Sequence, residues 1–446
     1  MKPEALLEKI REIPFVDPHT HVDSAHLGAR GLDDILLYHM VVSDLYNAGC
    51  PDGSRLSEAP SPEEAQSRLE RAIPYLPKIV NTSCYWGARM ILEDLYGVHE
   101  PVTMDNWRYI HDMIAERKDD RAWHREILRR AGIAKVVTEY GRRGDRSNDD
   151  ILEYSQEWAF FTRAQWGKFD AALLELEYAW NHEESCSPLP VTTKAEDLLF
   201  NKKIRSLEDV YAAIRHYCEK TPEDVCTNSA SHLSTDIHYR NVSVEEMEAA
   251  LKNRDRAGER ERDIYANFIQ QEYMRELDRR NSPLILQFSV GAEPLPYETC
   301  SYLHSGTAYQ FAEVIARYPK RLFTFSLSSA AHNQQFCTIA RELPNVVMVG
   351  YWWHNFFPTI IRQVISERLD MLSLEKQIGY FSDAYCLEWV YAKSQIIRRQ
   401  FAQVLSQRID AGQYDEKTAL DIVKAICLET PQKVFGITPN PALLKR

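Results

Sequence analysis

The sequence alternates short apolar runs with longer segments of helical periodicity. Because the apolar residues of these runs do not alternate with polar ones, we expect strands buried on both faces, as in a parallel sheet covered by helices. The predicted strands are residues 14–16, 134–139, 171–176, 284–290, 322–327, 346–351 and 378–382. Seven or eight such units over 446 residues favour a (β/α)8 barrel of the TIM type over a doubly wound sheet.

The helical segments indicate one domain, residues 1–446, with an insertion. Residues 50–130 carry little strand signal and much helical periodicity, so we predict a helical insertion after the first strand. The charged stretch 252–263 predicts the solvated face of a long helix. No G-x-G-x-x-G follows a predicted strand, which excludes the usual dinucleotide fingerprint. Helix starts are predicted at the capping residues Ser61, Ser206, Ser243 and Asp415.

Charge and composition narrow the class of protein. Lys plus Arg number 53 and Asp plus Glu 65, and the formal charge of −12 weighs against nucleic acid or an anionic membrane as partner. No run approaches the roughly 18 apolar residues of a membrane span, and the N-terminal segment is charged, so we expect a cytoplasmic protein. Nine scattered cysteines without a C-x-x-C predict buried thiols. A homo-oligomer is the expected assembly.

The motif FVDPHTHVD, residues 15–23, places two histidines directly after the first predicted strand. On extended backbone His19 and His21 would project to the same side, roughly 6–7 Å apart, a spacing that suits one divalent cation. At the carboxyl end of a barrel strand they would face the mouth where barrel enzymes carry out their chemistry. In the alternative reading one histidine caps the strand and the other packs in the core.

This motif, together with a lone aspartate, Asp383, after the last predicted strand, resembles the amidohydrolase superfamily of metal-dependent barrels. Further segments resemble the uronate isomerase family in the same order along the chain. These are HMVVSDLYNAG (39–49), NTSCYWGARMILEDLYGVHEPVTMDN (81–106), LILQFSVGAE (284–293), TFSLSSAAHNQQF (324–336) and VGYWWHN (349–355).

The resemblance implies an aldose–ketose isomerase that acts on hexuronates such as glucuronate and galacturonate. It implies one divalent metal held by His19, His21 and Asp383. Zinc is expected before manganese, given two nitrogen donors. The metal would polarise the C1 carbonyl and C2 hydroxyl. Asp383, or a metal-bound water that it orients, is then the candidate base, and His39 the candidate proton shuttle.

The chain departs from the family pattern around the substrate carboxylate. The family histidine of the 39–49 segment is usually followed by a tyrosine, whereas Met40 follows His39 here, and Tyr38 would point about 100° away on a helix. The family sequence Thr-Asp-Ser-Arg becomes Ser382-Asp383-Ala384-Tyr385, so a phenol replaces a carboxylate-gripping arginine. Ser289 stands where a histidine is typical.

Several residues could replace the missing groups. The predicted substrate-binding residues are Arg142, His238, Arg240, Trp353, His354, Asn355 and Tyr385. Weaker candidates are Glu139, Arg143, Glu177, His232 and His332, while Trp352 is expected in the core and His304 in a loop outside the site.

Two other functions remain open. The same metal ligands serve hydrolases and decarboxylases of the superfamily, which activate a water. Those enzymes often need a strand-four lysine or histidine and a strand-five histidine for two metals; His232 is present without a lysine, and Ser289 occupies strand five. A mononuclear site, and hence the isomerase, is favoured. The remaining alternative is a non-catalytic protein that binds sugar acids.

Overall fold

A computed structural model describes residues 2–51, 61–144, 146–157, 169–182, 200–233, 237–291, 306–352, 354 and 356–444. Eight parallel strands form one sheet in the order of the sequence, from β1 to β8. The strands are β1 (Phe15–Asp17), β2 (Ile133–Glu139), β3 (Leu152–Glu157), β4 (Val225–Leu233), β5 (Ile285–Val290), β6 (Phe323–Leu327), β7 (Val346–Val349) and β8 (Gln377–Ile378). All carboxyl ends therefore lie along one edge of the sheet.

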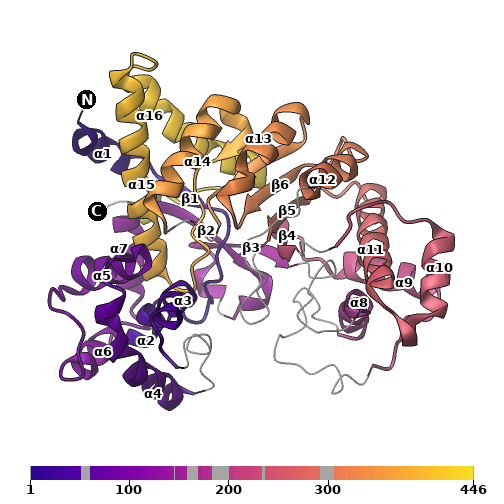
Figure 1. The fold of residues 1–446 in the computed structure, drawn as a ribbon, viewed down its shortest axis with the longest axis horizontal. Coiled ribbons are helices and arrows are strands. Elements are labelled where there is room, and N and C mark those ends of the chain that lie inside the picture. Colours follow the sequence, from indigo (N-terminus) through magenta and orange to yellow (C-terminus); the bar gives the residue numbers. More distant parts are fainter. Residues whose placement is uncertain are drawn as a thin grey trace.

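Helices surround the strands, with one group on either side of the molecule (Figure 1). Helix α1 (Pro3–Arg11) precedes β1, and β1 is followed by α2 (Leu32–Leu36), α3 (His39–Asn47), α4 (Pro62–Ala72), α5 (Ser83–Tyr96), α6 (Trp107–Ala115) and α7 (Arg121–Ala131). The opposite group contains α8 (Ala171–Asn181), α9 (Leu207–Lys220), α10 (Val244–Lys252) and α11 (Glu259–Arg279). The remaining helices are α12 (Thr307–Ala316), α13 (Asn333–Glu342), α14 (Pro358–Met371), α15 (Leu387–Asp410), α16 (Glu416–Lys424) and α17 (Thr430–Phe435).

Six of the seven predicted strands coincide with observed ones, and the helix caps are confirmed. Ser61 and Asp415 accept backbone hydrogen bonds from the first turns of α4 and α16. Ser206 and Ser243 form capping boxes at α9 and α10. The prediction of a strand at 171–176 is wrong, because the run continues as helix α8. The long helix predicted over 252–263 is also wrong, because α10 ends at Lys252 and α11 begins after Gly258.

An apolar cluster collects side chains from strands that are distant in the sheet. It contains Val16 of β1, Val137 of β2, Ile285 of β5, Val349 of β7 and Ile378 of β8. Alternate residues of β5 and β6, such as Phe288 and Phe325, instead pack among the helices. The sheet is therefore strongly curved around one apolar interior, since a flat sheet would keep β1 and β5 far apart.

Two backbone hydrogen bonds link the segments that follow the first and last strands. The amide of Asp383 donates to the carbonyl of His19 at 3.0 Å, and the amide of His21 donates to the carbonyl of Ala384 at 2.8 Å. Segments from the two ends of the sheet are thereby held side by side. This contact brings the predicted metal ligands together.

Two compositional expectations can be compared with the structure. Seven cysteines lie in the described ranges, and six of them are buried. Within those ranges, no helix combines the length and the apolar character that crossing a membrane requires.

Gly350, which follows β7, offers a test of packing next to the site. Its φ is 49°, and an added Cβ would lie 2.5 Å from Cδ1 of Phe381, whose ring is 5.3 Å from that of His19. Gly412 also has positive φ, 73°, but a Cβ there meets nothing within 4 Å. We expect Gly412→Ala to lower the free energy of unfolding by about 1 kcal/mol, and Gly350→Ala by about 2–4 kcal/mol, because overlap adds to backbone strain. Urea denaturation measures both, and equal losses would contradict the packing argument.

Candidate metal centre

His19, His21 and Asp383 form a cluster at the carboxyl edge of the sheet. Their potential ligand atoms all lie within 4.8 Å of one another. Asp383 Oδ1 is 3.4 Å from His19 Nε2 and 3.2 Å from His21 Nε2. The two histidines follow β1, and Asp383 follows β8 in a left-handed backbone conformation with φ 57°. For a residue other than glycine this conformation is strained, and such strain is concentrated at functional sites.

These distances fit a single divalent cation. Ligand atoms about 2.0–2.2 Å from one metal, at bond angles of about 90–109°, lie roughly 2.8–3.6 Å apart. The two measured separations from Asp383 fall inside that interval. Two imidazoles and one carboxylate also match the donor set of mononuclear zinc sites that leave positions open. The residues present therefore fit a divalent metal.

Glu139, the last residue of β2, contacts the ring nitrogen of His21 that does not face Asp383. Its Oε1 is 2.6 Å from His21 Nδ1, and its Oε2 accepts a hydrogen bond from Arg142 Nε at 2.7 Å. The other ring nitrogen of His21, Nε2, lies 3.2 Å from Asp383 Oδ1. A carboxylate beside the second ring nitrogen is the arrangement that supports metal-ligating histidines. Burial alone would raise the pKa of Glu139, but the charges of His21 and Arg142 outweigh it and hold that pKa well below its usual range.

The same charges act on His21 and Asp383. Burial would lower the pKa of His21, yet the neighbouring Glu139 and the hydrogen bond to Asp383 raise it well above its usual range. Burial would raise the pKa of Asp383, but hydrogen bonds with both histidines and the charges of His21 and Lys393 hold it well below. Asp383 is consequently ionised at neutral pH. A metal that binds His21 must displace a proton.

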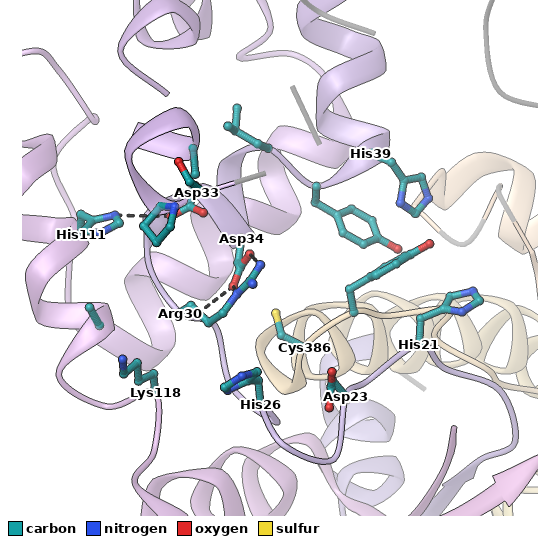
Figure 2. A pocket seen from close by; sticks show the side chains of 18 of the residues that line it. His21, Asp23, His26, Arg30, Asp33, Asp34, His39, His111, Lys118 and Cys386 are labelled. Atoms are coloured by element: carbon teal, nitrogen blue, oxygen red, sulfur yellow. Dashed lines mark hydrogen bonds and ion pairs between the residues drawn. The ribbon is translucent and has the colours of Figure 1, made fainter. Parts of the chain in front are cut away.

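A cavity of about 610 Å³ opens beside the cluster (Figure 2). His21 and His39 lie at one end, and His111 and Lys118 lie at the other. The other lining residues are Asp23, His26, Gly28, Arg30, Asp33, Asp34, Leu37, Tyr38, Ser61, Pro62, Ala65, Ala115, Arg142, Tyr385 and Cys386. Three residues of the predicted site, His39, Arg142 and Tyr385, thus share the cavity with His21.

Tyr385 and Tyr38 shape the end of the cavity nearest the cluster. The Tyr385 ring stacks on His21 with centroids 4.8 Å apart and lies 5.6 Å from His39. The Arg142 guanidinium lies 5.5 Å from the Tyr385 ring. Tyr38 was expected to point away from His39 on a shared helix. It instead precedes α3, which begins at His39, and the two rings are 4.2 Å apart.

The structure does not bring every predicted residue to this cavity. Arg240 is held by Glu246, and His238 Nδ1 is 3.0 Å from Gln310 Nε2; neither lines the cavity. His354 is buried and does not line it. Burial and the charge of Arg368 lower the pKa of His354 to about 3, so the ring is neutral. Trp353, Asn355, His304 and the side chain of His232 lie outside the described residues.

Of the weaker candidates that the structure describes, one contacts the metal cluster and the others lie elsewhere. Glu139 contacts His21, but Glu177 lies on α8, where it pairs with Arg254. Arg143 pairs with Asp149 and Asp224. His332 is 3.3 Å from Gln335, and Trp352 belongs to the apolar interior cluster, as expected.

Sequence reasoning missed Lys393, a buried residue of α15. Its Nζ donates to the hydroxyl of Tyr38 at 2.8 Å, to the carbonyl of Asp383 at 3.4 Å and to the carbonyl of Ser382. A lysine within a long amphipathic helix normally indicates a solvated face, so the sequence carries no signal for this contact.

Uronate isomerases are similar to this chain both in sequence and in fold. Uronate isomerases from Thermotoga neapolitana and Thermotoga maritima are each 26% identical to this chain over 104 residues. These matches span 23% of this chain and 23% of each relative. No model of a known protein family matches the chain.

Solved structures match over the whole length. Glucuronate isomerase from Caulobacter crescentus superposes with a TM-score of 0.74 at 12% identity, over 100% of this chain and 95% of the other. Uronate isomerase from Thermotoga maritima gives 0.71 at 14% identity over 97% of both chains. The enzyme from Bacillus halodurans gives 0.68 at 16% identity over 100% of both. The chain has the uronate isomerase fold. The resemblance indicated by the sequence motifs is thereby confirmed.

The assignment of these three residues as ligands predicts which substitutions weaken metal binding. We expect the wild-type protein to bind about one zinc or manganese ion per chain. His19→Ala, His21→Ala and Asp383→Ala should each weaken binding by about 100-fold or more, since each removes a ligand. His332→Ala is the control, because His332 lies outside the cluster. Elemental analysis after dialysis measures the bound metal. A control as depleted as the ligand variants would contradict the assignment.

Proposed function

We propose that the protein is a metal-dependent aldose–ketose isomerase of hexuronates such as glucuronate and galacturonate. The observation that carries the proposal is the His19, His21 and Asp383 cluster, on a fold shared with uronate isomerases. The cavity beside the cluster contains the groups that a sugar acid requires, namely a cation, a second histidine and phenols. A cytoplasmic location and a homo-oligomeric assembly stay predictions from the sequence.

The proposal includes a closed (β/α)8 barrel of one domain with a helical insertion. The backbone hydrogen bonds between the segments after β1 and β8 support closure, because they occupy the place where the first and last strands of a barrel meet. The helices α2 to α7, all between β1 and β2, support the insertion. Several of them line the cavity and would cover the mouth of the barrel.

His19, His21 and Asp383 would hold the metal, with zinc expected before manganese. When bound there, the metal supplies Lewis acidity to the C1 carbonyl and the C2 hydroxyl of the open-chain sugar, which eases loss of the C2 proton. Glu139 keeps His21 in the tautomer that such a site requires.

Asp383 and His39 are the proposed proton carriers. Asp383 Oδ1 faces both imidazoles, so Oδ2 is the oxygen that would accept the C2 proton and return it to C1. The electron pair left on C2 forms the enediol, and its collapse gives the ketose. His39, across the Tyr385 ring from His21, would move a proton between the oxygens on C1 and C2.

Arg142 is the proposed partner of the substrate carboxylate. Glu139 accepts from its Nε, and Arg142 lines the cavity, so the two terminal nitrogens of the guanidinium are the proposed donors to the substrate. A guanidinium can hold a carboxylate through two parallel hydrogen bonds. Tyr385, at the position of the family arginine, packs between Arg142 and His21 and forms one wall of the cavity.

Isomerisation in deuterated water tests the function. We expect the metal-loaded protein to convert glucuronate or galacturonate into the ketose, with deuterium entering C1 of the ketose and C2 of the recovered aldose. Chelation should stop both exchanges, and added metal should restore them. Nuclear magnetic resonance follows each position. Bound metal without exchange on any hexuronate would contradict the isomerase and favour hydrolysis or decarboxylation. Failure to bind metal would favour a non-catalytic sugar-acid binding protein.

The adjacent arginines provide a matched test of the carboxylate site. Arg142→Met should raise KM for glucuronate by about 10- to 100-fold, because it removes charge-assisted hydrogen bonds, and should change kcat less. Arg143→Met should leave KM unchanged, since Arg143 pairs with Asp149 and Asp224 instead. Binding of glucose, which has no carboxylate, controls for indirect effects through Glu139. An equal loss of affinity for glucose and glucuronate in Arg142→Met would refute the assignment.

A further inference from the structure

A buried pair, Tyr38 and Lys393, lies directly beneath the backbone of Asp383. The hydroxyl of Tyr38 donates to the Asp383 carbonyl at 2.6 Å. The ammonium of Lys393 donates to that hydroxyl at 2.8 Å, to the same carbonyl at 3.4 Å and to the carbonyl of Ser382. The two side chains are 4% and 1% exposed. Three ammonium hydrogens thus meet three oxygen acceptors, away from bulk solvent.

This pair acts on a backbone in an unfavourable conformation. The left-handed conformation of Asp383, φ 57°, costs about 1–2 kcal/mol for a residue with a Cβ. Two donors on its carbonyl fix the direction of that peptide, and hence the direction in which the carboxylate leaves the chain. The His19 carbonyl accepts from the Asp383 amide at 3.0 Å, so both peptide groups of this residue are anchored.

The same pair also fixes the start of α3. Tyr38 immediately precedes His39, the first residue of that helix. The Tyr38 ring stacks on Trp389 of α15 at 4.7 Å, and the Lys393 ammonium lies 4.5 Å from the Phe356 ring. A single buried contact therefore ties Asp383 to the segment that carries His39.

Stability alone does not explain a lysine at this position. Burying an ammonium costs several kcal/mol, and replacing a buried ionic group with an apolar one of similar volume is often neutral or stabilising. The hydrogen bonds of Lys393 instead converge on the backbone of a proposed metal ligand and its neighbour. Hydrogen bonds of this kind orient ligands around a metal.

We propose that Tyr38 and Lys393 are positioning residues, which hold the Asp383 backbone so that its carboxylate meets His19 and His21, and which set His39 beside the same centre. The inference rests on the proposed metal centre. It extends the proposed function through two residues that are not metal ligands, and it is tested through the metal alone.

Cobalt(II) binding to the full chain tests the proposal. Apo protein is titrated with Co²⁺, the visible absorption bands report the ligand geometry, and competition with a chelator gives the zinc affinity. Tyr38→Phe keeps the ring and removes the hydroxyl; Lys393→Met keeps the length and removes the ammonium. We expect each variant to bind zinc about 10- to 100-fold more weakly and to show altered cobalt bands.

Matched controls remove the same kinds of bond elsewhere. Tyr265, buried in α11, donates from its hydroxyl to the carbonyl of Ala250 at 2.6 Å, so Tyr265→Phe loses a comparable hydrogen bond. Lys135, buried in β2, donates to the carbonyl of Asp149 at 3.0 Å, so Lys135→Met loses comparable ammonium contacts. Both controls should keep wild-type zinc affinity and cobalt bands, even where they lower the melting temperature.

The outcomes separate this inference from the proposed function. Folded Tyr38→Phe with wild-type affinity and bands would overturn the inference, even if Lys393→Met fails to fold. Equal weakening by the controls would also overturn it, since the effect would then be general destabilisation. A wild-type chain that binds cobalt without isomerising hexuronates would reject the proposed function while this test keeps its meaning. Failure of the wild-type chain to bind cobalt or zinc would overturn both.

Discussion

The meeting of the segments after β1 and β8 is the contact on which the site depends. His21 and Asp383 are 362 positions apart in the sequence, yet their side chains approach to 3.2 Å. Two backbone hydrogen bonds hold these segments together, and neither segment belongs to a regular strand of the sheet. The ligand distances thus depend on the curvature that eight strands and their helices impose. A metal that binds only the assembled cluster would stabilise the whole fold by the same linkage.

Opposite charges alternate through the site. Asp383 and Glu139 lie on either side of His21, and Arg142 follows Glu139. Each buried carboxylate therefore faces a cation or a hydrogen-bond donor, which offsets the cost of its burial. The alternation extends from the proposed metal ligands to the guanidinium at the cavity. A negative substrate group would complete it, because Arg142 pairs with Glu139 and also lines the cavity.

Much of the fold and the core of the site could be predicted from sequence, because their signals are local. Apolar runs marked six strands, serine and aspartate caps marked four helices, and the H-x-H motif with Asp383 marked the cluster. Strands β3 and β4 were not predicted, because their sequences, LEYSQE and VCTNSASHL, are too polar to indicate burial. The apolar run at 171–176 was wrongly predicted as a strand, because leucine, alanine and glutamate continue it at helical spacing. The contacts of Lys393 and of His238 join segments that are distant in the sequence, which no local pattern encodes.

The departures from the family pattern become interpretable once these contacts are in view. The tyrosine that the family places after the helix histidine has a counterpart before it, and Tyr38 directs its hydroxyl at the Asp383 backbone rather than into the cavity. The arginine that the family places two residues after the aspartate is replaced by Tyr385, whose ring covers His21 and contacts Arg142. On the proposed function, the carboxylate-binding cation has moved from the segment after β8 to the segment after β2, on the other side of His21. The substrate carboxylate would then enter next to Glu139, so a hexuronate would bind with its acid end turned toward β2.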